Sequence, residues 1–214
     1  MSSKRAFDLA VSAVGLLLLS PLLCAIAVLV KLQDGEGIFF RQERIGKAGR
    51  PFGMWKFRTM VAHASFLGPA ITVGDDSRVT QIGRVLRRYK LDELPQLFNV
   101  LKGEMSMVGP RPEVPKYVAM YTDTQRAVLD LKPGVTDKAS IVYVDEATLL
   151  ARHADFERFY IEHLIPAKIR INLEYAAQAT LAGDIGVLLQ TIFSAVPSGA
   201  KSAISTARLQ RNLP

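Results

Sequence analysis

The stretch LAVSAVGLLLLSPLLCAIAVLV, residues 9–30, decides how this chain is organised. None of these residues is charged, and a run of this length can cross the roughly 30 Å hydrocarbon core of a bilayer as one helix. A signal peptide is the alternative, because Lys4 and Arg5 precede the run and residues 25–27 (Ala-Ile-Ala) resemble a cleavage site. Apolar residues continue past that site, which argues against cleavage. The run therefore predicts a segment that enters a membrane.

Ser20-Pro21 interrupts this run near its middle. Proline removes a backbone donor and clashes with the preceding turn, so a helix breaks or kinks there. At a rise of about 1.5 Å per residue, residues 6–20 and 21–32 would span only about 22 and 18 Å, and each piece is too short to cross alone. A re-entrant helix-break-helix hairpin, which enters and leaves by one face, fits these lengths. A kinked span across the bilayer is the alternative.

Basic residues flank both ends of the apolar run. Lys4 and Arg5 precede it, and a larger group follows it: Lys31, Arg41, Arg44, Lys47 and Arg50. The positive-inside rule then assigns both ends to the cytoplasm. We therefore expect a monotopic membrane protein, with the hairpin over residues 1–35 and a small cytoplasmic domain over residues 36–195.

The composition limits the partners of this protein. The 214 residues suffice for one domain with appendages, and 27 Lys and Arg against 20 Asp and Glu give a net charge of +7. Such a charge favours nucleic acid, phosphorylated small molecules or anionic lipid. Cys24 is the only cysteine, so no internal disulfide can form, and the three histidines show no zinc-like spacing with it. A disulfide framework and a thiolate metal site are thereby set aside.

The remaining sequence predicts an α+β fold that is mostly helical. Residues 38–60 alternate apolar and basic residues with glycines between, which is typical of short strands joined by turns. Apolar residues at helical spacing predict a helix over residues 80–89. Further on, we expect a turn and a short strand near residues 132–144, and two helical stretches in residues 156–193, around Pro166 and Gly183. Residues 64–78 read as a loop, and the basic tail over residues 196–214 as either membrane-bound or disordered.

Two neighbouring carboxylates, Asp92 and Glu93, follow the basic run of the predicted helix. The simplest interpretation makes Asp92 the N-cap of a helix formed by LPQLFNVLK. A helix N-terminus also keeps a carboxylate ionised and attracts phosphate. Because consecutive helical residues diverge by about 100°, the two acids are poorly placed as the acid and base of a glycosidase. One nucleophile, which forms an aspartyl-phosphate, and one metal ligand suit the geometry better.

Basic residues and a metal ion would have to offset the charge of a phosphate at such a site. Arg111 stands between two prolines that restrict the backbone, which would preposition its guanidinium for bidentate phosphate contact. Lys56, Arg58 and Arg87 are further candidates for phosphate binding, although each also fits a solvated charge. Mg²⁺ prefers a few carboxylates plus phosphate oxygens, so Glu93, beside Asp92, is the nearest metal candidate. The more distant candidates are Asp75 and Asp76, for which a solvated turn is the simpler interpretation.

Five motifs in order carry a family resemblance: KRAFDLAVSAVGLLLLSP, FFRQERIG, KFRTM, LDELPQLFNVLKGEMSMVGPRPE and KPGVT. They closely resemble the bacterial sugar transferase family of monotopic polyprenyl-phosphate phosphoglycosyl transferases. The resemblance covers residues 4–195 and is most specific over residues 91–113. It implies an Mg²⁺-dependent enzyme on the cytoplasmic face of the bacterial inner membrane. That enzyme moves a sugar 1-phosphate from a UDP-sugar to undecaprenyl phosphate, with release of UMP, in the first membrane step of glycan assembly.

The resemblance also implies roles for individual residues. Asp92 would be the nucleophile that forms a covalent phosphosugar intermediate, Glu93 would help to hold Mg²⁺, and Arg111 would bind phosphate. Ser20-Pro21 matches the break in the family's re-entrant membrane helix. In the turn after Thr136, many relatives continue with Gly-x-Ala-Gln, whereas this chain has Asp-Lys-Ala-Ser from Asp137 onward. We interpret this departure, which bears on sugar recognition, as a subfamily difference.

Two alternatives come from other classes of protein. A membrane-anchored nucleic-acid binder would explain the basic charge, but the aromatic residues form no clear stacking motif beside the arginines. A catalytically silent membrane scaffold of a glycan-assembly complex would keep the hairpin and tolerate Asp92→Asn. We therefore expect membrane lipid, a UDP-sugar and undecaprenyl phosphate as partners, and no nucleic acid. The sequence is compatible with a homo-oligomer and does not name the sugar.

Overall fold

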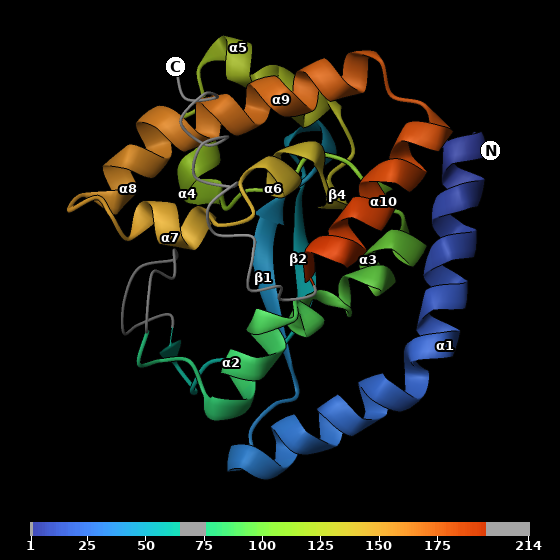
Figure 1. The fold of residues 1–214 in the computed structure, drawn as a ribbon, viewed down its shortest axis with the longest axis vertical. Helices are drawn as coiled ribbons and strands as arrows, with labels where there is room; N and C mark the ends of the chain where they lie inside the picture. Colours follow the sequence, from blue (N-terminus) through green and yellow to red (C-terminus); the bar gives the residue numbers. More distant parts are fainter. Residues whose placement is uncertain (1, 65–75, 196–214) are drawn as a thin grey trace.

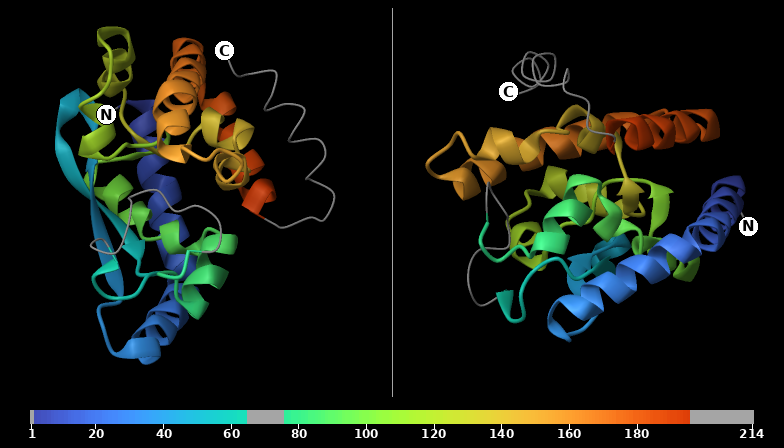
Figure 2. Two further views of the ribbon diagram at one scale, coloured as in Figure 1. Left: turned by 90° about the vertical axis from the view of Figure 1, so that its left-hand side faces the viewer. Right: turned by 60° about the horizontal axis from the view of Figure 1, so that its bottom comes forward.

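The computed structural model of this protein describes residues 2–64 and 76–195. These residues form a mostly helical α+β structure with two small sheets (Figure 1). Most of the loop expected over residues 64–78, and the tail over residues 196–214, lie outside the described residues. In the right-hand view of Figure 2, α9 (Ile165–Ala177) and α10 (Leu181–Ala195) lie along one side of the molecule and α1 (Ser3–Asp34) along the other.

The apolar N-terminal run folds as one long helix, α1 (Ser3–Asp34). It begins where the Ser2 side chain accepts a hydrogen bond from the backbone of Arg5, and it ends at Gly35, which is left-handed with φ 75°. Pro21 lies inside the helix, and α1 bends near its middle (Figure 1). Proline removes only one N–H, so the flanking turns keep their hydrogen bonds and the interruption is a kink within one helix rather than a break between two.

Both halves of α1 pack against the rest of the protein. In the first half, Arg5 donates hydrogen bonds to two backbone carbonyls at the end of α3 (Gln96–Lys102). In the second half, Ile26 and Val30 are buried against Phe57 and Leu86. Near the bend, by contrast, the side chains of α1 face outward, with Leu17 and Leu18 exposed by 73% and 72%. Within the described residues, α1 is the one helix long and apolar enough to cross a membrane.

Two strand pairs contain the expected strands, together with β3 (Ser106–Val108), which the sequence analysis did not predict. β1 (Phe39–Ile45) pairs antiparallel with β2 (Pro51–Phe57), and the short helix η1 (Lys47–Gly49) lies in the turn between them. β3 pairs in parallel with β4 (Gly134–Thr136). Beside this pair, a Cβ at Gly134 would lie 2.2 Å from the backbone nitrogen of Gly109, so this close approach requires glycine. β4 thereby holds the backbone just before the Pro-Arg-Pro turn.

The helix expected over residues 80–89 is α2 (Gln81–Arg88), whose N-terminus is capped by the side chain of Thr80. The strand expected near residues 132–144 ends at Thr136, because the Asp137 side chain accepts a hydrogen bond from Ser140 and starts a helix, α6. The two C-terminal helical stretches are confirmed. The other helices are η3 (Leu91–Glu93), α4 (Pro115–Val118), α5 (Asp123–Arg126), η4 (Ala127–Asp130), α6 (Lys138–Val142), α7 (Glu146–Leu150), α8 (Phe156–Phe159), η5 (Tyr160–Leu164), α9 (Ile165–Ala177) and α10 (Leu181–Ala195).

Two apolar clusters form most of the core. One lies among α4, α6, α7, η5 and α9, and it includes Tyr117, Tyr143 and Leu164. The other lies among β2, α3, β3 and α10, and it includes Met54 and Val100. Elements of both clusters also contribute residues to the lining of a cavity.

Candidate active site

One cavity of about 710 Å³ brings the predicted site residues together. Its lining comes from the β1–β2 hairpin, η3, the Gly-Pro-Arg-Pro turn and the helices α6, α7 and α9. Ser20 and Pro21 lie in α1, away from this lining. The residues predicted to act on phosphate or metal all line it: Asp92, Glu93, Arg111, Arg87, Lys56 and Arg58.

The backbone around Asp92 differs from the simplest expectation. Lys90 adopts a left-handed conformation with φ 55°, and the chain then forms the single 3-10 turn η3. The helix α3 starts at Gln96 after Pro95, without any side-chain cap. The interpretation of Asp92 as the N-cap of this helix is therefore wrong, because Asp92 lies inside η3 and Pro95 is the residue that precedes α3. Asp92 instead lines the cavity and is only 6% exposed.

Glu93 is held by two cations. The guanidinium of Arg111 reaches both oxygens of the Glu93 carboxylate, with an Nη1–Oε2 distance of 3.1 Å, and Lys56 Nζ lies 3.3 Å from Oε1. Burial alone would raise the pKa of Glu93, but the charges of Arg111 and Lys56 outweigh burial and hold that pKa far below its usual value. Glu93 is therefore ionised at neutral pH and committed to these cations.

The neighbouring Asp92 is in the opposite situation. Within the described part of the chain, no hydrogen bond reaches its carboxylate. Burial, and then the negative charge of Glu93, raise the pKa of Asp92, while Lys56, Arg87 and Arg111 act against that rise. Of these two neighbouring acids, Glu93 thus has two cationic partners, whereas the oxygens of Asp92 are uncommitted.

The other predicted phosphate ligands differ in how freely they could reach a ligand. Arg87 donates through Nε to the hydroxyl of Thr59 at 2.9 Å. Arg58, by contrast, forms two hydrogen bonds with the carboxylate of Asp34 and one with the carbonyl of Gly37. It therefore links β2 to the end of α1, and it is the least available of the predicted phosphate ligands.

Asp137 supports the turn that presents Arg111. It is 1% exposed, and its Oδ2 atom accepts hydrogen bonds from the Arg111 backbone N–H at 2.9 Å and the Asn172 amide at 2.8 Å. Its other oxygen accepts from the backbone of Ser140. The sequence analysis noted Asp137 only as a departure from relatives, because its partners are distant in sequence.

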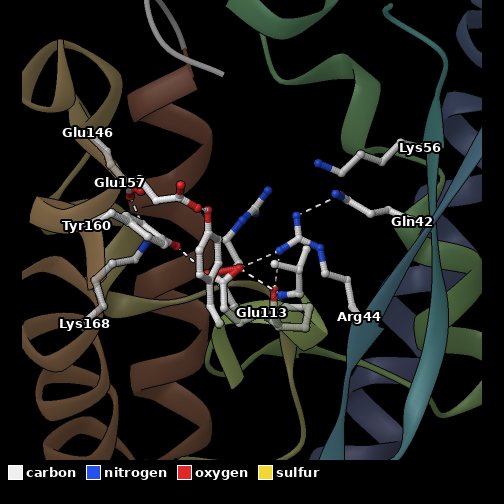
Figure 3. Close-up of polar contacts among 12 residues, drawn as sticks. Gln42, Arg44, Lys56, Glu113, Glu146, Glu157, Tyr160 and Lys168 are labelled. Carbon is white, nitrogen blue, oxygen red and sulfur yellow. Dashed lines mark hydrogen bonds and ion pairs between the residues drawn. The ribbon is translucent and has the colours of Figure 1, made fainter. Parts of the chain in front are cut away.

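A second polar network, in the same cavity, was missed by the sequence analysis (Figure 3). Glu113 accepts hydrogen bonds from Arg44 Nη1 at 2.8 Å and from the Tyr160 hydroxyl at 2.5 Å. Lys168 pairs with Glu146 at 2.7 Å. Tyr160 belongs to η5, a π-helical turn, and such turns are frequent at functional sites. Tyr160 and Lys168 lie eight residues apart, a spacing that puts both on one face of a helix, and this spacing is the signal that could have found this network.

The predicted Mg²⁺ site can be tested against the donor atoms present. Asp92 and Glu93 both line the cavity, and Mg²⁺ commonly takes one or two carboxylates together with substrate phosphates and water. Across residues 2–64 and 76–195, no group of three or more His, Cys, Asp or Glu side chains could hold a metal, so phosphate oxygens would complete the coordination. Asp92 fits this limited role with its uncommitted oxygens, and Glu93 would bind Mg²⁺ beside the cations that it already pairs with. Of the more distant candidates, Asp76 pairs with Arg78, whereas Asp75 lies outside the described residues.

Comparison with known proteins places the chain in one family. Residues 1–198 match the family described as bacterial sugar transferase, and the chain belongs to that family. The undecaprenyl-phosphate N-acetylgalactosaminephosphotransferase of Aeromonas hydrophila, which uses UDP-N-acetylgalactosamine by its name, is 38% identical over 192 residues, or 88% of this chain and 42% of that protein. The UDP-glucose:undecaprenyl-phosphate glucose-1-phosphate transferase of Escherichia coli is 36% identical over 89% of this chain and 39% of its own length.

A third relative is closer in length. The exopolysaccharide production protein ExoY of Sinorhizobium fredii is 38% identical over 75% of this chain and 77% of its own length. The chain thus spans less than half of the first two relatives and most of this one.

Proposed function

We propose that this protein transfers a sugar 1-phosphate from a UDP-sugar to undecaprenyl phosphate and releases UMP. The observation that carries the proposal is the uncommitted carboxylate of Asp92 in a cavity with the Glu93–Arg111 pair and with Lys56 and Arg87. The names of the relatives, which are undecaprenyl-phosphate sugar phosphotransferases, support it and favour it over the catalytically silent scaffold.

The reaction proceeds in two displacements at one phosphorus. First, a carboxylate oxygen of Asp92 attacks the phosphorus that bears the sugar, the bond from that phosphorus to the bridging oxygen breaks, and UMP leaves. This step leaves an aspartyl-phosphosugar. A phosphate oxygen of undecaprenyl phosphate then attacks the same phosphorus, the bond to Asp92 breaks, and the carboxylate is restored. The relay spares the protein from bringing two anionic substrates together at once.

The other residues bind and orient phosphate. Arg111, Lys56 and Arg87 offset the charge of the diphosphate, and the planar guanidinium of Arg111 suits bidentate contact. Glu93 holds Arg111 and Lys56 in place before the substrate arrives. Glu93 and Asp92 would also hold Mg²⁺, which neutralises phosphate charge when it is bound. Arg58 contributes chiefly by linking β2 to α1.

Membrane attachment follows from α1. Both of its halves pack on one domain, and its outward-facing leucines lie near the bend, so α1 dips into the bilayer and returns by the same face. The basic flanks support a position of that face on the cytoplasmic side of the bacterial inner membrane. The site is then within reach of a soluble donor and of a lipid-borne acceptor.

The test measures UMP release by protein purified in detergent with Mg²⁺, undecaprenyl phosphate and a panel of UDP-sugars. Without the acceptor, we expect a single burst of UMP and a labelled sugar phosphate retained on the protein. Asp92→Asn should abolish both, and Glu162→Gln, which alters an exposed ion pair, should change neither. Normal UMP release by folded Asp92→Asn would contradict the role of Asp92 as the nucleophile. If the burst of UMP appears only when undecaprenyl phosphate is present, the two-step covalent mechanism is contradicted. Silence with every UDP-sugar would favour the scaffold.

A further inference from the structure

One face of the η5–α9 helix forms a wall of the cavity that the proposed chemistry does not use. Tyr160, Lys168 and Asn172 lie on this face, which we call the α9 wall, at separations of eight and four residues. Each contacts a different carboxylate that also lines the cavity: Tyr160 contacts Glu113, Lys168 contacts Glu146 and Asn172 contacts Asp137. In Figure 3, Glu146, Tyr160 and Lys168 lie on the opposite side of Glu113 and Arg44 from Lys56.

Charge is divided unevenly between the two ends of the cavity. At the end formed by β2, α2, η3 and the Pro-Arg-Pro turn, basic side chains outnumber acidic ones; the described lining there is Lys56, Arg58, Arg78, Arg87, Lys90 and Arg111 against Asp92 and Glu93. At the other end, which the α9 wall closes, acidic side chains outnumber basic ones; the lining there is Arg44 and Lys168 against Glu113, Asp137 and Glu146. Phosphates therefore belong at the first end, and the second end does not attract a further anion.

The second end offers hydrogen bonds of both kinds in a small space. Carboxylates accept from hydroxyl groups, while the ammonium of Lys168 and the amide of Asn172 donate to them. Burial acts against the charge of Lys168, but Glu146 outweighs it and raises the pKa of Lys168, so the pair is ionised at neutral pH. Tyr117, Tyr121 and other aromatic or apolar side chains complete this end. A few placed polar groups on an apolar wall are the usual lining of a site for a neutral ligand.

We propose that the α9 wall binds the sugar of the donor and selects an uncharged hexose over a hexuronic acid. This inference rests on the proposed function and deepens it. The carboxylate of a hexuronic acid would approach Glu113 or Glu146 in a partly buried site, where the two cations, Arg44 and Lys168, already have these acids as partners. An anion without its own partner in such a place is costly.

The test compares two donors that differ only at the sixth carbon of the sugar. UMP release is measured with the neutral UDP-hexose that the wild-type protein uses best and with the matched UDP-hexuronate. We expect kcat/KM to be lower for the hexuronate by about 100-fold, the size of the penalty for an unpaired buried charge. Comparable values for the two donors would overturn the inference while leaving the transferase function intact. Silence with every UDP-sugar would instead remove the proposed function, and this inference with it.

A variant locates the selectivity. Glu146→Gln removes one carboxylate that faces the α9 wall. It should reduce the ratio of kcat/KM between the neutral donor and the hexuronate by about tenfold, because the hexuronate then meets one acid fewer. Glu162→Gln, on the exposed side of the same helix, is the matched control and should leave the ratio unchanged. Inhibition by UMP, which lacks the sugar, should not change in Glu146→Gln. If UMP inhibits Glu146→Gln more weakly than wild type, by the same factor by which KM for the donor rises, then the nucleoside binds at the α9 wall. That result would overturn the assignment of the sugar to this wall.

Discussion

At the scale of the residue, Asp92 and Glu93 are adjacent yet electrostatically different. Arg111 and Lys56 hold the pKa of Glu93 low, whereas burial raises the pKa of Asp92. When the environment moves the pKa values of neighbouring acids in opposite directions, the two groups usually have different roles. In the proposed reaction, the group without partners would form the bond to phosphorus, and the paired group would organise the cations.

Asp137 provides a test of how the turn around Arg111 is held. Asp137→Ala leaves the Arg111 N–H, the Asn172 amide and the Ser140 N–H without their acceptor, and each buried unpaired group costs about 1–3 kcal/mol. We expect a lower Tm and a fall in kcat of roughly tenfold or more at a temperature where the variant is folded, since the Arg111 guanidinium loses its position.

The control for this prediction is Asp155→Ala, which removes the cap of α8 at an exposed position. It should lower Tm slightly and leave kcat unchanged. If Asp137→Ala lowers Tm but keeps wild-type kcat and KM, Asp137 serves the fold alone and does not position Arg111.

Sequence analysis found the charged residues that lie in short motifs, but it missed the residues that hold those motifs in position. Asp92, Glu93 and Arg111 are conspicuous in one short segment, and the structure places them in one cavity. Asp137 and Asn172 act across separations of 26 and 35 residues, which no local pattern reveals.

At the scale of the element, α1 is attached to both segments that carry the site. Arg5 donates to the carbonyls of Val100 and Leu101 at 2.6 and 2.9 Å, at the C-terminal end of α3. Asp8 is buried, and it accepts hydrogen bonds from the hydroxyl of Ser106 and the backbone N–H of Met107 in β3. Since α3 follows Asp92 and Glu93 while β3 precedes Arg111, these contacts join α1 to both sides of the site.

Asp8→Ala tests the strength of this attachment. The variant leaves a buried hydroxyl and a buried N–H unpaired, and we expect it to lose about 1–3 kcal/mol of stability. For a domain of this size the loss corresponds to a fall in Tm of roughly 2–10 °C. Tm is measured in detergent, with Glu43→Ala at an exposed position as a control that should stay within about 0.5 kcal/mol of wild type. An unchanged Tm in Asp8→Ala would mean that α1 is attached chiefly through its apolar contacts.

Elements with a clear period were predictable, and irregular ones were not. The β1–β2 hairpin and α2 follow directly from alternation and from helical spacing with a Thr80 cap. The turn from β4 into α6 depends on the side-chain cap formed by Asp137, and η5 is a π-helical turn that periodicity does not distinguish from an α-helix. These irregular elements are the ones that line the cavity beside the α9 wall.

At the scale of the whole molecule, the course of α1 determines on which side of the membrane the site lies. A straight helix of 32 residues would be about 48 Å long and would carry its second half away from the domain that its first half contacts. Instead, the second half buries Ile26 and Val30 against Phe57 and Leu86, and Asp34 at its end pairs with Arg58. Both ends of α1 therefore stay with the domain.

This arrangement predicts that both ends of α1 face the cytoplasm. The only native cysteine, Cys24, is replaced by alanine, and Ser3→Cys or Glu36→Cys then gives a single thiol just before or just after the apolar run. A thiol reagent that cannot cross the inner membrane should leave both positions unlabelled in intact cells and label both after the membrane is opened. Labelling of one position alone in intact cells would show a spanning helix. In that case only one of the two basic flanks would lie in the cytoplasm, and the two halves of α1 could not both pack on the same domain.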